Sequence, residues 1–256
     1  MNKTERFKDK KVALALGGGA VLGAAHIGVI KALEEFGMKI TAISGTSAGA
    51  IVAALYAFGK SADEIEKIVL DFEWKKLSSI TISKFAILSN KKIGEIIKLH
   101  IGEKTFQEAS IPLAMIATDI SSGAKVIMDK GIVCDAVVAT TCIPGVFVPV
   151  ELYGLSLVDG GIVENVPLSC LKKDDADFVI GVDLISRHVY KKPNNFIEVL
   201  HNSFGFLVKA NKSFQTKDAD ILIEPDLNEF NAIDMSQIGN LTKKGYEETK
   251  RIINNL

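Results

Sequence analysis

Two long stretches without charged residues, 12–30 and 40–59, constrain the fold of this chain more than any other feature, and glycines interrupt both of them. Each stretch has about the 20 residues that a transmembrane helix needs. The first contains Gly17, Gly18 and Gly19 in succession, and each glycine costs a helix roughly 1 kcal/mol relative to alanine. A short buried strand, a glycine turn and a helix account for the same hydropathy. We therefore expect two strand–turn–helix units rather than two membrane spans.

The composition is that of a folded protein with a large core. The chain has 256 residues, of which 48% are hydrophobic, and this is enough for one sizeable domain. We expect one domain over 1–256, in which 1–10 form an N-terminal tail. The 30 basic and 31 acidic side chains leave a net charge of -1, so the bulk charge does not predict binding to nucleic acid.

Two features bear on the compartment in which the protein works. Lys10 and Lys11 precede the first apolar stretch and small residues follow at Ala24 and Ala25, so a signal peptide is an alternative interpretation. The helical pattern runs unbroken through the supposed cleavage site, which favours a folded unit. Three cysteines without CxxC spacing fit buried thiols of a reducing compartment better than a disulfide framework or a zinc site. We therefore expect a cytoplasmic location and no metal ion.

Strand and helix patterns alternate along most of the chain, which predicts an α/β fold with a mostly parallel central sheet covered by helices on both faces. The expected strands or strand ends are 11–16, 39–44, 111–120, 124–128, 142–152, 156–161, 177–184 and 220–225, and the expected helices are 23–36, 50–59, 133–140, 195–214 and 236–254. Amphipathic pieces at 61–110 predict either a helical cap or lid, or further helices packed on the outside of the sheet.

The pentapeptide GTSAG at 45–49 lies between an apolar strand and an apolar helix. In this context a GxSxG sequence predicts a sharp turn that holds its serine, Ser47, in a strained conformation above the sheet edge. Gly45 and Gly49 are small enough to allow such a turn, and the N-terminus of the following helix favours developing negative charge. A plain turn with Ser47 as the helix N-cap is the alternative, but the flanking elements favour a nucleophile.

A serine nucleophile needs donors that stabilise the oxyanion, and the first glycine turn can supply backbone amides. If the strands at 11–16 and 39–44 are parallel neighbours, this turn lies at the same sheet edge as the serine. A phosphate loop of the dinucleotide fold is the alternative, but the GxGxxG pattern is incomplete and the second strand ends without an acidic residue. The candidate oxyanion donors are Gly17, Gly18 and Gly19.

Asp159 is the candidate base, because it follows the apolar strand SLV and precedes two glycines, so that its carboxylate is displayed at a strand end. A Ser/His/Asp triad is the alternative, for which His188 and His201 are the late histidines. His188 lies in a charged loop and His201 in a helical pattern, so we favour Asp159, for which an ordinary hairpin turn at DGG is the alternative. A free aspartate, with a pKa near 3.9, is a poor base unless burial raises its pKa. We expect a dyad of this kind to stay active below about pH 6.5, where a histidine base is protonated.

These segments together resemble the patatin-like phospholipase family, and the chain looks most like the small bacterial members that consist of little more than the catalytic domain. The resemblance is carried by LGGGAVLGAAHIGVIKALEE, ISGTSAGAIVAALYA, ATDISSG, TTCIPGVFVPV and LVDGGIVENVP, and it covers nearly all of 11–184. It implies a three-layer fold, Ser47 as nucleophile, Asp159 as its partner in a dyad without histidine, and the glycine turn as oxyanion loop. It also implies hydrolysis of lipid carboxylic esters through an acyl-enzyme, in the manner of a phospholipase A or lysophospholipase, without a cofactor.

Two residues of the glycine turn depart from the family pattern. Leu22 stands where arginine or lysine is usual, and Ala20 where a glycine is common. The substrate preference therefore does not carry over with the resemblance, and two other functions stay open. One is a carboxylesterase or thioesterase that uses the same dyad on soluble substrates, and the other is a non-catalytic regulatory relative. His26 also matches a family histidine, and we expect it to pack beneath the loop.

The segment 196–214 combines apolar residues such as Phe196 and Phe204 with the basic Lys209 and Lys212. This pattern is compatible with a helix on a membrane surface, although it is also typical of a helix packed on its own domain. We expect a lipid or acyl ester as the substrate and only transient, peripheral contact with a membrane.

Overall fold

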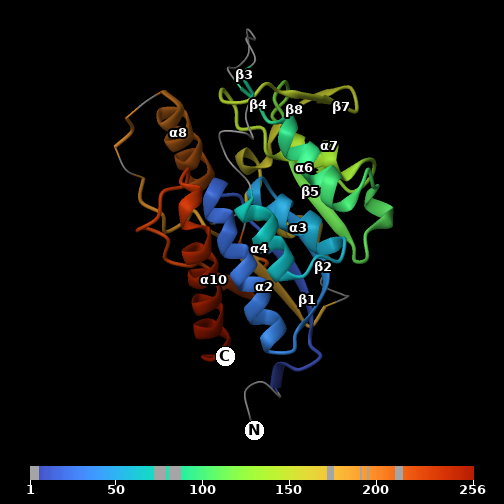
Figure 1. Ribbon diagram of the computed structural model, residues 1–256, viewed down its shortest axis with the longest axis vertical. Coiled ribbons are helices and arrows are strands. Elements are labelled where there is room, and N and C mark those ends of the chain that lie inside the picture. The colour runs from blue at the N-terminus through green and yellow to red at the C-terminus, as the bar shows by residue number, and fades with distance from the viewer. Residues whose placement is uncertain are drawn as a thin grey trace.

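The computed structural model describes residues 6–71, 79–80, 88–171, 176–190, 192–194, 196–210 and 216–256. A central sheet and the helices packed on it make up this part of the chain (Figure 1). The strands are β1 (Lys11–Leu16), β2 (Lys39–Gly45), β5 (Leu113–Asp119), β6 (Lys125–Met128), β7 (Val150–Leu152), β8 (Leu155–Asp159), β9 (Phe178–Val182) and β10 (Ile221–Ile223), with a separate pair β3 (Ser79–Ile80) and β4 (Leu88–Ser89).

The helices fall between the strands of the sheet, as the alternating pattern predicts. The α-helices are α2 (Ala25–Glu35), α3 (Ala48–Ala57), α4 (Ala62–Leu70), α6 (Lys91–Ile101), α7 (Val133–Thr140), α8 (Phe196–Ala210) and α10 (Ile238–Ile253). Short 3-10 turns are η1 (Ala20–Ala24), η2 (Phe106–Glu108), η3 (Gly160–Ile162), η4 (Leu168–Cys170) and η6 (Met235–Gln237). None of these described helices is long and apolar enough to cross a membrane.

The sheet has eight strands in the order β10-β9-β1-β2-β5-β8-β7, and β6 pairs with β5 beside this path. The strands from β10 to β5 are parallel, whereas β6, β8 and β7 join antiparallel. The expected α/β class is therefore confirmed. β1 and β2 are parallel neighbours with Leu16 opposite Gly45, so both glycine turns leave the sheet at the same edge.

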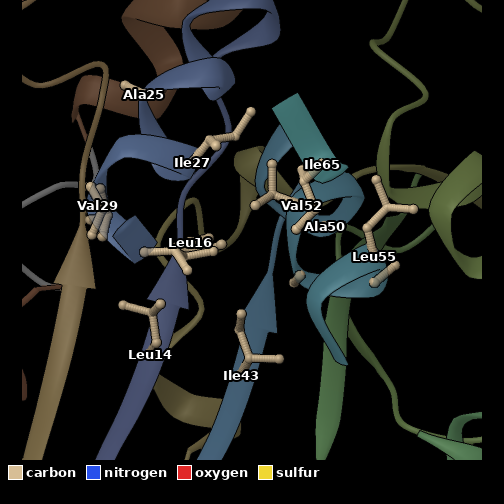
Figure 2. Close-up of a cluster of buried hydrophobic side chains, with 14 of the residues drawn as sticks. Leu14, Leu16, Ala25, Ile27, Val29, Ile43, Ala50, Val52, Leu55 and Ile65 are labelled. Atoms are coloured by element: carbon tan, nitrogen blue, oxygen red, sulfur yellow. The ribbon is translucent and has the colours of Figure 1, made fainter. Parts of the chain in front are cut away.

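The two faces of the sheet are covered unequally. Leu14, Leu16 and Ile43 project into the main core, where they meet side chains of α2, α3 and α4 (Figure 2). On the other face, Ala13 and Ala15 pack against a small cluster from β9 and the segment 166–171. Within the described residues, the members of this cluster outside the strands come from coil and the turn η4.

Each of the two uncharged stretches forms a strand, a turn and a helix, as expected. The predicted strand 142–152 is shorter than expected, because only β7 at its end is a strand. In the expected cap, α4 and α6 bury Ile65, Ile68, Ile93 and Ile97 in the main core. The middle of the cap, 72–78 and 81–87, lies outside the described residues, and its role as a lid stays a prediction.

Candidate active site

Ser47 occupies the sharp turn between β2 and α3, with backbone angles φ 53° and ψ −124°. A residue with a side chain rarely adopts a positive φ, and such a conformation costs of the order of 1–3 kcal/mol. The Ser47 amide donates to Thr140 Oγ1 at 3.0 Å, and the Thr140 hydroxyl in turn donates to the carbonyl of Ile116 at 2.6 Å. The end of α7 and strand β5 therefore hold the strained turn in place.

The flanking glycines are needed because the turn approaches other backbone closely. A Cβ added to Gly49 would lie 2.1 Å from the carbonyl oxygen of Leu16, and one added to Gly45 would lie 2.5 Å from Cα of Ala50. Real Cβ atoms do not come this close to backbone. The local geometry is thus that of the predicted serine elbow, with α3 seated against the end of β1.

Asp159 ends strand β8 and is fully buried. Its Oδ1 accepts a hydrogen bond from the amide of Gly161 at 2.8 Å, while its Oδ2 makes no hydrogen bond of normal geometry. Burial raises the pKa of the carboxyl to about 7, against the opposing influence of the nearby Ser47 hydroxyl and the Gly161 amide. The carboxyl therefore carries a proton over much of the acidic range.

This pKa changes the expected pH dependence. With the pKa of a free carboxyl, an aspartate base is expected to stay active below about pH 6.5. A carboxyl with a pKa of about 7 is instead mostly protonated there, and a protonated carboxyl cannot accept the serine proton. An aspartate base in this position titrates in the same range as a histidine, so only substitutions can distinguish the two.

The backbone amides of the glycine turn differ in their hydrogen bonds, and those of Gly17 and Gly18, two of the expected donors, are already paired. The Gly17 amide donates to the carbonyl of Val182 at 3.0 Å, and the Gly18 amide donates to Asn165 Oδ1 at 3.1 Å. Among the described residues, the amides of Gly19 and Ala20 have no acceptor. These two amides, rather than those of Gly17 and Gly18, are available to an oxyanion.

His26 packs beneath this turn, as expected. Its ring is fully buried, and Nε2 lies 2.7 Å from the carbonyl oxygen of Gly17, which can only accept. Burial lowers the pKa of His26 to about 4, so the ring is neutral near pH 7 and Nε2 carries the proton. The resulting hydrogen bond ties the Gly17 carbonyl, and with it the loop, to helix α2.

A narrow cavity brings most of the candidate residues together. Ser47 and Asp159 line it with the loop residues Gly18, Gly19 and Ala20. The rest of the wall carries polar and aromatic side chains from several elements, namely Asn165, Tyr190, His201 and Phe204, together with Ile143, Ile185 and Gly205. Ser47, Asp159, Gly19 and Ala20 thus line one space.

His188 and His201, the two histidines considered for a triad, lie in different surroundings. His188 is buried and its Nδ1 faces the carbonyl of Leu227 at 3.3 Å, outside the cavity. His201 lies in the cavity wall. Burial lowers the pKa of His201, opposed by Asn202 and Glu198, whereas the Ser47 hydroxyl lies near the carboxyl of Asp159 and opposes the rise that burial causes in its pKa. The geometry favours Asp159 over His201 as the partner of the serine.

Two residues of the site had no role in the sequence analysis. Thr140 supports the serine turn, and Asn165 ties Gly18 to the segment that follows Asp159. Both lie in segments that carry the family resemblance. Thr140 is a polar residue at the end of an apolar helix, and Asn165 is a polar residue after a glycine turn. Their hydrogen bonds bridge 93 and 147 residues of sequence, which no local pattern indicates. Among the described residues, no three His, Cys, Asp or Glu side chains gather as a metal site would require.

The fold and the site define the class of this protein, an α/β protein with a serine elbow and a glycine-rich loop at the same sheet edge. Comparison with known families agrees, because a model described as patatin-like phospholipase matches residues 14–171. The chain belongs to the patatin-like phospholipase family.

Several proteins resemble the chain over much of its length. An uncharacterized NTE family protein of Mycobacterium tuberculosis (strain ATCC 25618 / H37Rv) is 37% identical over 177 residues, which are 68% of this chain and 49% of that protein. Lysophospholipase NTE1 of Debaryomyces hansenii is 30% identical over 220 residues, 80% of this chain and 14% of that protein. The match spans 49% of the length of three mycobacterial relatives and 31% of three others.

A solved structure shares the fold. The crystal structure of VipD from Legionella pneumophila superimposes with a TM-score of 0.65 at 15% sequence identity, and the match covers 97% of this chain and 67% of that chain. This likeness extends beyond the residues that match the family model and includes the C-terminal part of the sheet.

Proposed function

We propose that this protein is a lipolytic serine acyl hydrolase of the phospholipase A or lysophospholipase type. The observation that carries the proposal is the shared cavity, in which the strained Ser47 lies beside the buried Asp159 and the amides of Gly19 and Ala20, which have no acceptor among the described residues. Membership of the patatin-like phospholipase family and the similarity to a lysophospholipase support lipid esters as the substrate class.

The first half of the reaction forms an acyl-enzyme. Ser47 Oγ attacks the ester carbonyl carbon while its proton moves to Asp159, whose Oδ2 has no other hydrogen bond. The carbonyl oxygen becomes an oxyanion that accepts hydrogen bonds from the amides of Gly19 and Ala20. When the intermediate collapses, the ester C–O bond breaks and the alcohol leaves with the proton from Asp159. The acyl group is then bound to Ser47.

The second half of the reaction releases the acid. A water molecule attacks the acyl carbonyl and gives a proton to Asp159. The bond to Ser47 Oγ then breaks, Asp159 returns its proton to this oxygen, and the carboxylic acid departs. Asp159 begins each half-reaction ionised, so the pKa of about 7 predicts that kcat/KM falls about tenfold for each pH unit below pH 7 and levels off above it.

The test combines substitutions with two kinds of substrate. Ser47→Ala and Asp159→Asn should each lower ester hydrolysis at pH 8 by at least about 1,000-fold. The first variant lacks the nucleophilic hydroxyl, and the second lacks the carboxylate that accepts the proton of this hydroxyl. His201→Ala should cost less than about tenfold. Fluorophosphonate labelling, located by mass spectrometry, reports whether Ser47 is the nucleophile. Release of fatty acid from phospholipid vesicles is compared with hydrolysis of short soluble esters.

Each alternative predicts a different result. A chain whose Ser47 is not labelled, and which hydrolyses neither substrate, is the non-catalytic relative. Labelling with turnover of soluble esters but no release from vesicles indicates the carboxylesterase or thioesterase. If His201→Ala abolishes turnover while Asp159→Asn retains it, a triad replaces the dyad.

Helix α8 supports contact with a lipid surface as part of this function. Its inner residues, such as His201 and Phe204, line the Ser47 cavity, while its outer face exposes Phe196, Phe206 and Leu207 by 60%, 57% and 49%. The segment 189–217 contains five lysines and one acidic residue, a charge balance that complements anionic lipid. The helix that covers Ser47 thus exposes apolar side chains on its solvent-facing side.

A further inference from the structure

A second cavity borders the glycine-rich loop. Its walls come from η1, α3, α4, α6, η6 and the start of α10, and every side chain that lines it is apolar. Ile51 and Met235 in its lining are only partly buried, so the space opens toward the surface and is not a sealed packing defect. An open cavity without a polar side chain fits an apolar ligand.

This cavity begins beside the nucleophile. Ala20 lines both the second cavity and the Ser47 cavity, and Ala48, the residue after Ser47, also lines the second one. A Cβ at Gly23 would lie 2.6 Å from Cβ of Ala48, so the loop and the start of α3 are in direct contact here. The two cavities therefore have Ala20 as a common lining residue.

The two cavities differ in chemistry as the two halves of an ester do. The Ser47 cavity offers the side chains of Asn165, Tyr190 and His201, which suit an alcohol or a headgroup. The second offers aliphatic side chains such as Val52, Val69 and Ile93, which suit a hydrocarbon chain. The backbone donors of Gly19 and Ala20 stand on the loop between them.

We propose that the cavity lined by Ile51 and Met235 is the acyl-chain site, which binds an unbranched alkyl chain while its carbonyl is bonded to Ser47. The proposal rests on the proposed function, since it needs Ser47 to carry the acyl group. The alcohol half of the substrate remains in the Ser47 cavity, and the alkyl chain passes Ala20.

The test uses two fluorophosphonates that differ only in their alkyl group, ethyl or dodecyl, and measures the rate at which each modifies Ser47. The wild-type protein should react faster with the dodecyl probe. Ile51→Phe and Met235→Phe fill the cavity from opposite walls. Each should lower the ratio of the dodecyl rate to the ethyl rate at least about tenfold, which corresponds to the displacement of about two methylene groups. Ile127→Phe, at an exposed position of β6 outside both linings, should leave the ratio unchanged.

The outcomes separate this proposal from the proposed function. If Ser47 reacts with both probes but the ratio is the same in wild type and in the two folded variants, or if the wild type shows no preference for dodecyl, the acyl-chain site is refuted and the hydrolase survives. If neither probe modifies Ser47, both proposals fail. Circular dichroism shows which variants are folded, and one folded variant of the two is sufficient.

Discussion

At the scale of single residues, Ser47 shows how a local sequence stores strain that distant residues maintain. Its positive φ is unfavourable for a residue with a Cβ, and the surrounding structure must compensate for it. Thr140 does so directly, because its hydroxyl connects the Ser47 amide to Ile116. The same conformation exposes the hydroxyl to the cavity, so the strain and the proposed chemistry have one origin.

The strain can be measured by comparing two inactive variants. Ser47→Ala and Ser47→Gly both remove the hydroxyl, but only alanine keeps the Cβ that the φ of 53° disfavours. We expect Ser47→Gly to have the larger free energy of unfolding, by about 1 kcal/mol, after the greater freedom of glycine in the unfolded chain is subtracted. Urea denaturation of the two variants gives this difference. Equal stability, or a more stable Ser47→Ala, would show that no strain is stored at this turn.

At the scale of elements, the packing of α10 against α2 positions the glycine-rich loop. The two helices lie side by side (Figure 1), and Thr242 Oγ1 of α10 donates to the carbonyl of Ala24 at 3.3 Å. A Cβ at Gly28 would lie 1.8 Å from the carbonyl oxygen of Thr242, and one at Gly245 would lie 2.0 Å from that of Ala25. The helices touch backbone to backbone, and α2 carries His26 beneath the loop.

Two glycines of α10 give a matched pair of variants. Gly245→Ala forces the helices apart, so we expect the free energy of unfolding to fall by about 1–3 kcal/mol. Gly239→Ala adds a Cβ that meets no atom within 4 Å, so we expect it to rise by up to about 1 kcal/mol through helix propensity. Chemical denaturation of both variants is the measurement. A loss of stability in both, or in neither, would mean that the close approach does not hold in solution.

At the scale of the whole molecule, the proposed catalytic cavity is enclosed between the sheet and α8. Ser47 is only 7% exposed and Asp159 is wholly buried, while α8 covers them with an outer face that is apolar. On the other side of the loop, α3, α4 and α6 enclose the proposed acyl-chain site. The exposed apolar side chains of α8 and part of the wall of the Ser47 cavity therefore belong to one helix.

The outer face of α8 predicts how the protein binds vesicles. The double variant Phe206→Ser and Leu207→Ser should bind phosphatidylglycerol vesicles at least about tenfold more weakly than the wild type, because two exposed apolar side chains no longer leave water on binding. Leu99→Ser, at a position of α6 that is 79% exposed, is the matched control and should bind as the wild type does. Vesicle cosedimentation measures both. Equal binding by the double variant and the control would show that the outer face of α8 does not contact the lipid.

Much of the framework could be predicted from local sequence. The strands at 11–16 and 39–44, the helix at 133–140 and the serine turn follow from apolar periodicity and from glycines placed where backbone must turn. These signals act over a few residues and need no knowledge of distant partners. The predicted strand over 142–152 was too long, because a continuous apolar run does not distinguish a strand from a buried loop.

The sequence by itself therefore determined the fold class, the two glycine turns and the chemistry that Ser47 and Asp159 could perform. Only the tertiary structure decided which loop amides lack an acceptor among the described residues, because Val182 and Asn165, which accept from Gly17 and Gly18, are distant in sequence. It also decided the pKa of Asp159, since complete burial outweighs the hydrogen bonds that stabilise the charged form. Desolvation and hydrogen-bond pairing depend on which segments meet, and that is settled only when the sheet and its helices are packed together.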